Sequence, residues 1–492
     1  GSRGPLAQSC LWRKDYEKAK KAHILVVNHA LLLAAPPAWL PYDALVLDEA
    51  HNLEDVAANN LGFTLSALRV ERLLNDLYNV ETARGLALSL KTLDPTIVGT
   101  IRGLVTKAHA ANKTFFAEAQ KALSLASGFV VGNNSSARRI LKPDLVPDTL
   151  SPALRPISSE LAGLISHAGT KEQEDLIASI RKRFDTVASE LKAFLANDNP
   201  DMVFWGELRI SRKKPTLELK MAPVHVGEAL HSLFFSKNKP VFLTSATLSA
   251  NRSFQIFRER MGVLNANETL VDSPFDYANR VRLYIPKDLP NPKGDAAKSV
   301  ENVVEHTLAL EKVVPGGIFV LFTSWKMLKA VETKLRSSLE GRKLFVQGSA
   351  RPEDLLSEFQ KAGHGVLLGT DTYWQGVDVP GDALSCVIIT RLPFTSPESP
   401  LEEARNDWYK AQGKNPFSDF SLPRAIVKFR QGFGRLMRRH DDRGVVVVLD
   451  PRIKTMKFGQ QFLGSLPSSL EIADASELTV FFHGLQAAPK NQ

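Results

Sequence analysis

The chain has few of the features that mark secreted or membrane proteins. Its 492 residues include only two cysteines, Cys10 and Cys386, which are too few for a disulfide scaffold and fit a reducing compartment. No run of about 18 uncharged apolar residues is present, and the N-terminus lacks a basic segment followed by an apolar one. These absences argue against a membrane span and a secretory signal, so we expect no membrane partner and a cytoplasmic location.

The composition is that of a folded, basic, multi-domain protein. Hydrophobic residues make up 44% and charged residues 23% of the chain, which excludes global disorder. A chain of this length fits two to four packed domains better than one. The formal net charge of +9 favours a polyanionic partner. A basic surface that binds nothing fits the same number, so charge alone does not assign nucleic-acid binding.

Short apolar runs near the start have the composition of buried strands. The runs 23–27 (His-Ile-Leu-Val-Val) and 44–47 (Ala-Leu-Val-Leu) are bounded by polar or turn residues, as is typical of strands in a parallel sheet. From Leu53 to about Asn199, apolar residues recur every three or four positions, which predicts an inserted helical domain. The clearest series is Leu176, Ile180, Phe184, Val187, Leu191 and Phe194.

A second α/β region is predicted in the C-terminal half. Strand signals return after residue 201 with a run at 240–244, and the Pro-rich passage 288–294 is typical of a linker. Beyond it, four apolar runs alternate with helical segments, which predicts a parallel, doubly wound sheet. These runs are 317–322, 365–368, 386–389 and 444–449.

The sequence Asp48-Glu49-Ala50-His51 follows the second apolar run. It places two carboxylates at the carboxyl edge of a parallel sheet, where open α/β folds bind ligands. Such a pair suits nucleotide hydrolysis: Asp48 can hold Mg²⁺, Glu49 can orient or deprotonate the attacking water, and His51 can relay the state of the site. An ordinary helix start with the same letters remains the alternative.

A second candidate motif, 431–438 (Gln-Gly-Phe-Gly-Arg-Leu-Met-Arg), precedes the last apolar run. Helical spacing would put Arg435 and Arg438 on one face, so that two guanidinium groups converge on one anion. Arginine fingers of this kind stabilise phosphoryl transfer by roughly a thousandfold or more. The alternative is an exposed basic helix that contacts DNA phosphates.

Several further motifs occur in a fixed order. They are 26–30 (Val-Val-Asn-His-Ala), 48–51, 245–247 (Ser-Ala-Thr), 321–324 (Leu-Phe-Thr-Ser), 369–378 (Gly-Thr-Asp-Thr-Tyr-Trp-Gln-Gly-Val-Asp) and 431–438. This set resembles superfamily 2 helicases. The passages 272–277 (Asp-Ser-Pro-Phe-Asp-Tyr), 391–394 (Arg-Leu-Pro-Phe) and 444–452 are similar to the DinG branch of the XPD-like (Rad3-related) group, and the resemblance covers the chain from Cys10 onward.

The resemblance implies an α/β protein with two RecA-like, doubly wound parallel-sheet domains, the first incomplete, and an inserted helical arch. Residues 1–54 would hold the end of an iron–sulfur region and the part of helicase domain 1 with the acid pair. Residues 55–200 would form the arch, 201–285 the remainder of domain 1 and 286–492 domain 2.

The resemblance also implies roles for individual residues. Asp48 and Glu49 would hold Mg²⁺ and activate water, and Ser245 and Thr247 would couple hydrolysis to domain movement. Gly376 and Asp378 would approach the nucleotide from the second domain. Three further residues would sense the γ-phosphate as ATP closes the cleft between the two α/β domains. They are Gln431, Arg435 and Arg438.

Contacts to single-stranded DNA are implied at the second sheet. Thr323, Ser324 and Thr370 carry hydroxyls and lie near backbone N–H groups that can bind phosphates without reading sequence. Trp374 lies in the same loop and is a candidate for stacking on a base, an interaction worth roughly 1–3 kcal/mol; packing is its alternative role. Cys386 lies in an apolar run and is expected to be a small buried side chain.

Two features of the family are missing from this sequence. Cys10 matches the last cysteine of the family's [4Fe–4S] domain, but no earlier cysteine is present, and such clusters need four thiolates as a rule. No Gly-x-x-x-x-Gly-Lys-Ser/Thr phosphate loop occurs either; Gly413-Lys414 is followed by Asn. The family carries both features ahead of the position of Cys10, so we expect an N-terminally truncated chain that hydrolyses no ATP on its own.

The sequence therefore predicts an ATP- and Mg²⁺-dependent DNA helicase that moves on single-stranded or forked DNA. The family implies 5′ to 3′ movement and a role in DNA repair or replication. A module without the ATP loop that binds nucleic acid and does no work is one alternative. An RNA-directed helicase with the same Asp-Glu-Ala-His motif is another, although it would not be expected to carry Cys10 at this spacing or the passage 273–277.

Overall fold

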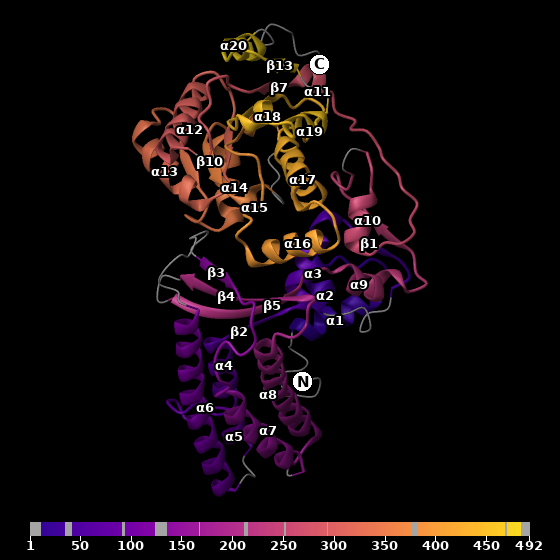
Figure 1. Cartoon of the computed structure of the whole chain (residues 1–492), viewed down its shortest axis with the longest axis vertical. Coiled ribbons are helices and arrows are strands. Elements are labelled where there is room, and N and C mark those ends of the chain that lie inside the picture. Colours follow the sequence, from indigo (N-terminus) through magenta and orange to yellow (C-terminus); the bar gives the residue numbers. More distant parts are fainter. Residues whose placement is uncertain are drawn as a thin grey trace. The chain divides into compact units, whose positions relative to one another are not determined.

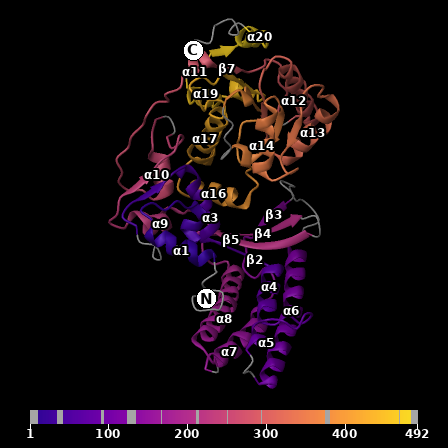
Figure 2. The same ribbon diagram turned by 180° about the vertical axis from the view of Figure 1, so that it is seen from behind.

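A computed structural model of the chain describes residues 11–34, 42–90, 94–123, 135–166, 168–210, 215–249, 252–292, 294–374, 381–467 and 470–483. The chain forms two compact units. Unit 1 comprises Gly1–Leu243, Arg260–Val263 and Pro397–Arg405; unit 2 comprises Thr244–Glu259, Leu264–Ser396 and Asn406–Gln492. Figures 1 and 2 show the elements of both units from opposite sides. No helix in these described ranges is long and apolar enough to cross a membrane.

Unit 1 combines a small parallel sheet, a four-stranded antiparallel sheet and a group of long helices. In chain order its elements are α1 (Leu11–Lys21), α2 (His29–Ala34), β1 (Leu45–Leu47), the short 3₁₀ helix η2 (Ala50–Asn52), α3 (Leu53–Leu61), β2 (Phe63–Ser66), α4 (Ala67–Leu77), α5 (Leu86–Ser89), α6 (Pro95–Ala122), β3 (Ser135–Arg139), α7 (Ser151–Ile165), α8 (Lys171–Ala196), β4 (Met202–Ile210), β5 (Pro215–Pro223), α9 (Gly227–Leu230), the π-helix η3 (His231–Phe235) and β6 (Val241–Leu243).

The small parallel sheet pairs β1 with β6, from Leu45 opposite Val241 to Leu47 opposite Leu243. These two strands make up the whole of this sheet in the described part of the chain. The strand expected at 23–27 is wrong: these residues pair with neither β1 nor β6, and Val26 is 89% exposed. An apolar run becomes a strand only where a neighbour completes its hydrogen-bond ladder, and no described residue pairs with this run.

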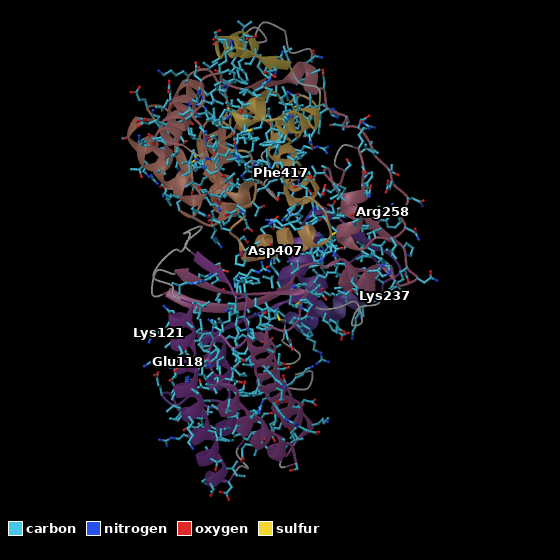
Figure 3. The ribbon with its side chains drawn as sticks, in the orientation of Figure 1. Glu118, Lys121, Lys237, Arg258, Asp407 and Phe417 are labelled. Carbon is cyan, nitrogen blue, oxygen red and sulfur yellow. The ribbon has the colours of Figure 1, made fainter. Side chains whose placement is uncertain are left out.

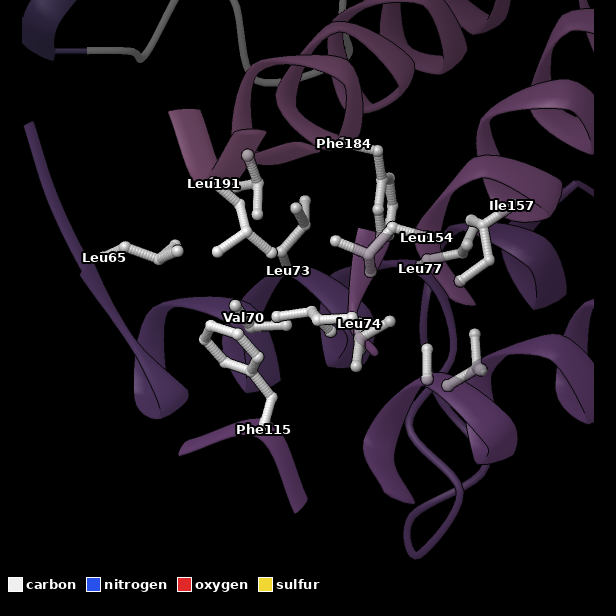
Figure 4. Packing of buried hydrophobic residues seen from close by; sticks show 14 of the residues in the cluster. Leu65, Val70, Leu73, Leu74, Leu77, Phe115, Leu154, Ile157, Phe184 and Leu191 are labelled. Carbon is white, nitrogen blue, oxygen red and sulfur yellow. The ribbon is translucent and has the colours of Figure 1, made fainter. Parts of the chain in front are cut away.

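The inserted helices predicted between 55 and 200 are present as α4, α6, α7 and α8. Local signals fix their ends: Thr170 accepts a hydrogen bond from the N–H of Gln173 at the start of α8, and Asn197 ends that helix in the left-handed conformation. Their buried faces form one core (Figure 4). The exposed Glu118 and Lys121 lie on the outer side of α6 (Figure 3), as its amphipathic pattern requires.

The insertion also contains strands that the helical periodicity did not reveal. The antiparallel sheet has the order β2-β5-β4-β3, and β4 pairs with β5 from Met202 opposite Pro223 to Ile210 opposite Pro215. Leu65, Phe204 and Leu219 of this sheet belong to the same core as the helices. The region around the arch therefore takes in residues 202–223, which the expected boundaries gave to the remainder of domain 1.

Unit 2 contains the predicted parallel sheet. Its elements are α10 (Gln255–Met261, whose last two residues belong to unit 1), α11 (Tyr277–Arg280), β7 (Val281–Tyr284), α12 (Ala296–Glu311), β8 (Ile318–Leu321), α13 (Trp325–Ser338), β9 (Leu344–Val346), α14 (Pro352–Ala362), β10 (Val366–Gly369), α15 (Asp371–Trp374), η4 (Gly381–Ala383), β11 (Cys386–Ile389), α16 (Pro400–Ala411, divided between the units after Arg405), η5 (Phe417–Ser421), α17 (Leu422–Phe433), β12 (Gly444–Val448), α18 (Arg452–Thr455), α19 (Gly459–Gly464), β13 (Leu470–Ile472) and α20 (Ser476–His483).

The strands of this sheet lie in the order β13-β7-β12-β11-β8-β10-β9, and each described pair is parallel. Alternate residues face two separate cores: Phe319 packs with α14, α17 and α19, whereas Val320 packs with α12, α13 and α20. Helices thus cover both faces, which confirms the doubly wound prediction. The sheet includes β7, so it begins ahead of the expected boundary at residues 285 and 286.

Candidate active site

The acid pair follows β1 directly. Leu47 and Ala50 are buried and fix the backbone on either side, while the side chains of Asp48 and Glu49 are exposed. Glu49 has a φ of 49° and a ψ of 41° as it leads into η2, a left-handed conformation that costs a residue other than glycine roughly 1–2 kcal/mol. Two exposed carboxylates thus follow the strand directly, and their assignment as a metal-binding and water-activating pair stays a prediction.

His51 is held against the second acid. Its Nδ1 lies 3.3 Å from Glu49 Oε2, and its side chain is only 9% exposed. Burial lowers the pKa of His51 below its usual range, because the charged ring loses water; the Glu49 carboxylate opposes this shift, and the neighbouring His29 reinforces it. The imidazole is therefore neutral at neutral pH and can exchange a hydrogen bond with Glu49, in line with a relay.

In unit 2, the Ser245–Thr247 segment forms a tight turn against the end of α17. The Thr247 N–H donates to Ser245 Oγ at 3.2 Å, and Thr247 is 4% exposed. Gln431 Nε2 donates to Thr247 Oγ1 at 3.4 Å. Arg430 donates through Nη2 to the Ala246 carbonyl, also at 3.4 Å. Two motifs far apart in the sequence thus meet through side-chain hydrogen bonds, at the long end of the usual range.

The two candidate finger arginines do not share a helical face, so that expectation is wrong. Helix α17 ends at Phe433. The chain then turns because Leu436 and Met437 enter the core, each 2% exposed, and because Asp442 Oδ2 accepts the N–H groups of residues 438 and 439, both at 2.7 Å. A helix could not satisfy both demands.

The same turn gives the two arginines different surroundings. Arg435 is 7% exposed, and its Nε and Nη2 donate to the Trp374 carbonyl at 3.1 and 2.5 Å. The Arg438 side chain is exposed. Arg438 is therefore the more accessible of the two arginines in unit 2, and the role of each stays a prediction.

The expected DNA contacts follow β8 and β10 at the carboxyl edge of the large sheet. Ser324 caps α13 by accepting from the N–H of Met327 at 3.3 Å, and Thr323 beside it is half-buried. Thr370 is 3% exposed, and its N–H and hydroxyl donate to Gln347 Oε1 at 2.6 and 3.0 Å. Thr323 and Ser324 are thus more accessible than Thr370.

Trp374 has no ring face open to a base. It is fully buried, and its Nε1 donates to the Phe322 carbonyl at 3.1 Å. Lys428 of α17 lies over the ring, with Nζ 5.7 Å from the ring centroid. Of the two roles weighed for Trp374, this conformation shows packing, because the ring and its donor are both occupied between β8, β10 and α17.

The sequence motifs missed two residues that organise this region. Arg430 holds the Ala246 carbonyl, and Gln347 holds Thr370. Gln347 directly follows β9, so the rule that ligand-binding groups gather at the carboxyl edge of a parallel sheet could have found it. Arg430 adjoins Gln431 but precedes the motif, and its partner is a backbone group, so no side-chain pattern marked it.

Other expected residues lie outside the described part of the chain, namely Gly376, Asp378 and Cys10. Cys386 is buried within β11, and burial raises the pKa of its thiol far above its usual range. The described residues contain no group of three or more His, Cys, Asp or Glu side chains placed to hold a metal. The roles of Asp48 as a Mg²⁺ ligand and of Cys10 as a cluster ligand stay predictions.

Comparisons with known proteins agree with these motifs. The family model for the helicase C-terminal domain matches residues 307–469. The "ATP-dependent DNA helicase YoaA" of Escherichia coli is 30% identical over 515 residues, which cover 98% of this chain and 72% of that protein. The "3′-5′ exonuclease DinG" of Bacillus subtilis is 37% identical over 302 residues; the match spans 60% of this chain and only 32% of that protein's length.

Solved structures show the same fold. The chain resembles one titled "XPD_Helicase" with a TM-score of 0.57 and 14% identity, over 95% of this chain and 78% of that one. It also resembles the "Structure of S. tokodaii Xpd4" with a TM-score of 0.52 and 15% identity, over 87% and 75%. At this level of identity, the likeness concerns the arrangement of the elements.

Proposed function

Since the chain belongs to the DinG/XPD-type family of superfamily 2 helicases, we propose that it serves ATP-driven movement along DNA. The substrate would be single-stranded or forked DNA, and the direction 5′ to 3′. DNA repair or the resolution of replication conflicts is the proposed context. ATP with Mg²⁺ is the proposed energy source.

The meeting of the 245–247 turn with the end of α17 is the observation that supports this proposal most. A helicase must link the state of a nucleotide to a change in shape, and that link needs a group near the phosphates in contact with a segment that moves. Gln431 contacts Thr247, and Arg430 contacts the backbone beside it. Loss of a γ-phosphate from Gln431 would therefore act directly on this turn.

The acid pair would carry the chemistry. Asp48 would bind Mg²⁺ of the bound nucleotide, and the metal would stabilise charge on the phosphates. Glu49 would orient the attacking water and accept its proton. The neutral ring of His51, in contact with Glu49, would hold that carboxylate in place without adding a positive charge beside the metal. Arg438 would stabilise the negative charge that develops during transfer.

DNA would lie along the carboxyl edge of the large sheet. Thr323 and Ser324 precede the N-terminus of α13, whose first N–H groups and positive dipole end favour a phosphate. Contacts of this kind bind the backbone without reading sequence. Thr370 would need to exchange its hydrogen bond to Gln347 for a phosphate oxygen, so it would join only after a change in this loop.

A second function is favoured by one feature of the sequence: residues 1–492 contain no phosphate loop of the Gly-Lys-Ser/Thr type. Such a chain could bind nucleic acid without performing work. Both functions predict salt-dependent binding to DNA, so binding alone does not separate them.

ATP turnover separates the two functions. We expect residues 1–492 alone to bind a single-stranded oligonucleotide and to hydrolyse no ATP; turnover by a clean preparation would show that the nucleotide site is misplaced. If the upstream coding sequence supplies a phosphate loop, the extended protein should hydrolyse ATP in response to DNA. A start codon near Gly1 and no such loop would favour the binding module.

In the extended protein, Arg438→Ala should abolish DNA-stimulated turnover and leave DNA binding within about twofold, since the lost charge acts on the transition state. Lys457→Ala, in the same unit but outside the motifs, is the control and should retain turnover. Undiminished turnover in Arg438→Ala would refute its assignment as the finger.

A further inference from the structure

Glu54 is a buried acid that the proposed chemistry does not use. It lies in the first turn of α3, directly after η2 and the acid pair, and is 3% exposed. A carboxylate removed from water is costly unless opposite charges or hydrogen bonds replace the solvent. The groups that surround the Glu54 carboxylate therefore indicate its role.

Two arginines bind the two oxygens of this carboxylate. Arg260 Nη2 donates to Glu54 Oε2, and Arg405 Nη2 lies 3.6 Å from Glu54 Oε1. Arg260 has a side chain that is 15% exposed, and Arg405 one that is 1% exposed. Both arginines therefore form ion pairs with Glu54 in surroundings that exclude most water, where charges are screened less than at the surface.

Arg405 extends the cluster to three further groups. Its Nη1 lies 3.1 Å from Asp55 Oδ1 and 3.1 Å from Glu402 Oε1. Its Nε donates to the Val224 carbonyl at 3.4 Å. One guanidinium thus joins both acids at the start of α3 to the first turn of α16.

The two arginines share an unusual position in the chain. Unit 1 receives two short segments from later in the sequence, Arg260–Val263 and Pro397–Arg405, and the residues on both sides of each segment belong to unit 2. One arginine of each segment binds Glu54. The first segment ends α10, which follows the Ser245–Thr247 turn, and the second begins α16. A single carboxylate therefore contacts one arginine from each of the two late segments.

We propose that Glu54 is a positioning residue that anchors both segments to the helix behind the acid pair. Its catalytic consequence rests on the proposed function. When unit 2 changes shape during the nucleotide cycle, the displacement of these two segments is transmitted to α3. Through η2, the same displacement reaches Asp48 and Glu49. Neither Glu54 nor its arginines contact the reacting atoms. In this proposal the cluster fixes the positions of the Asp48 and Glu49 carboxylates.

A stabilising role alone fits the cluster less well. Buried ion pairs contribute little net stability compared with apolar side chains of the same shape, whereas the loss of one partner is strongly unfavourable. If the cluster served stability alone, removing all its charges together should restore both the stability and the turnover of the protein. If it serves positioning, stability should return while turnover stays low.

Hydrogen exchange on residues 1–492 tests the anchor without ATP turnover. In Glu54→Gln, amides of 53–61, 260–263 and 397–405 should exchange faster, on the order of a hundredfold, because two buried guanidinium groups lose the one carboxylate that they share. The matched control is Glu190→Gln, which removes the ion pair with Arg69 (2.7 Å) in the same unit; its effect should stay within α4 and α8. Unchanged exchange at 397–405 in Glu54→Gln would overturn the anchor.

Turnover in an ATP-hydrolysing, extended form tests positioning. Glu54→Gln should lower the DNA-stimulated kcat roughly tenfold to a hundredfold with little change in KM for ATP, as expected when catalytic groups shift by about 1 Å. Arg405→Lys keeps the positive charge but lacks the branched guanidinium group, so it should lose less of the rate than Glu54→Gln does. A variant that removes every charge of the cluster (Glu54→Gln, Asp55→Asn, Glu402→Gln, Arg260→Met and Arg405→Met) should regain stability but not rate.

The outcomes distinguish the two proposals. Faster exchange with wild-type kcat would overturn positioning and leave the helicase proposal standing. Recovery of the full rate in the variant without the cluster's charges would also overturn positioning, because stability would then be the cluster's whole role. If the extended wild-type protein hydrolyses no ATP, the proposed function fails, and the exchange experiment still decides whether Glu54 anchors the two segments.

Discussion

The two parallel sheets are built from similar apolar runs but differ in how they are supported. In unit 2, all four residues of β8, β10 and β11 are buried, because helices cover both faces. In unit 1, Val46 of β1 is 63% exposed and Phe242 of β6 is 55% exposed. Apolar composition therefore predicts a strand in both units, whereas burial depends on the layers around it.

This difference bears on the acid pair. In unit 2, the side chains that follow the strands, such as Thr323 and Thr370, are supported by a sheet that is buried on both faces. In unit 1, Asp48 and Glu49 come after a three-residue strand with one buried residue. The position of the pair must then depend more on η2 and α3, the next elements in the chain, than on the sheet that precedes it.

The largest expected effect compares one phenylalanine from each sheet. Phe319 of β8 is 1% exposed and packs against Phe359 with 5.2 Å between ring centroids. Phe319→Ala should destabilise unit 2 by about 3–5 kcal/mol, through lost burial and the cavity left behind. Phe242→Ala should destabilise unit 1 by less than about 0.5 kcal/mol. Urea unfolding followed by exchange in each unit measures both; equal losses would break the comparison.

A second test compares the aspartates that come after β12 and β1. Asp450 is fully buried, accepts the Leu392 N–H at 2.8 Å and binds the Arg452 guanidinium. Asp450→Asn should cost unit 2 about 2–4 kcal/mol by leaving Arg452 partly uncompensated. Asp48→Asn should leave stability unchanged and abolish ATP turnover in the extended protein. Thermal unfolding with a turnover assay separates the two; a stability loss in Asp48→Asn would contradict its assignment.

A smaller effect is expected at the left-handed residue between β1 and η2. Glu49→Gly should stabilise unit 1 by about 0.5–1 kcal/mol, since glycine adopts this conformation without strain but loses more chain entropy. Ala83→Gly, with a φ of 48° in the same unit, is the matched control and should gain a similar amount. Thermal unfolding measures both. Destabilisation by Glu49→Gly alone would mean that its contact with His51 outweighs the strain.

The smallest effect concerns His51. Burial lowers its pKa in the folded state, so below a pH of about 6.5 the unfolded chain binds protons that the folded chain does not. The stability of unit 1 should therefore fall as the pH drops through this window, and His51→Gln should reduce the slope. His306→Gln, at a position in unit 2 where burial also lowers the pKa, should change only the slope of unit 2. A wild-type slope in His51→Gln would contradict the assignment.

The sequence predicted those features that local pattern controls. The runs at β8, β10, β11 and β12 are continuous and apolar, so the sequence predicted both that they form strands and that these strands pair in parallel. The sequence also predicted the helical insertion. The run at 23–27 looks the same, yet it forms no strand, because a strand depends on a neighbour that a local pattern does not contain.

The parts of the site that the sequence missed depend on distant partners. Arg435 and Arg438 have helical spacing, but Asp442 and two core side chains end the helix before them. Trp374 sits in a motif loop, yet a carbonyl at the end of β8 takes its donor. Arg405 lies three residues after Glu402, which looks like an ordinary surface pair until Glu54 and Asp55 are placed beside it.

The segmented make-up of unit 1 also has a consequence for synthesis on the ribosome. Glu54 emerges early, but its partner Arg405 is made only after the whole of β7 to β11 has been translated. Unit 1 would therefore hold an incomplete charge cluster during most of its synthesis and close it only near the end. No single cut in the gene separates the two units, because segments of unit 1 alternate with segments of unit 2 between residues 244 and 405.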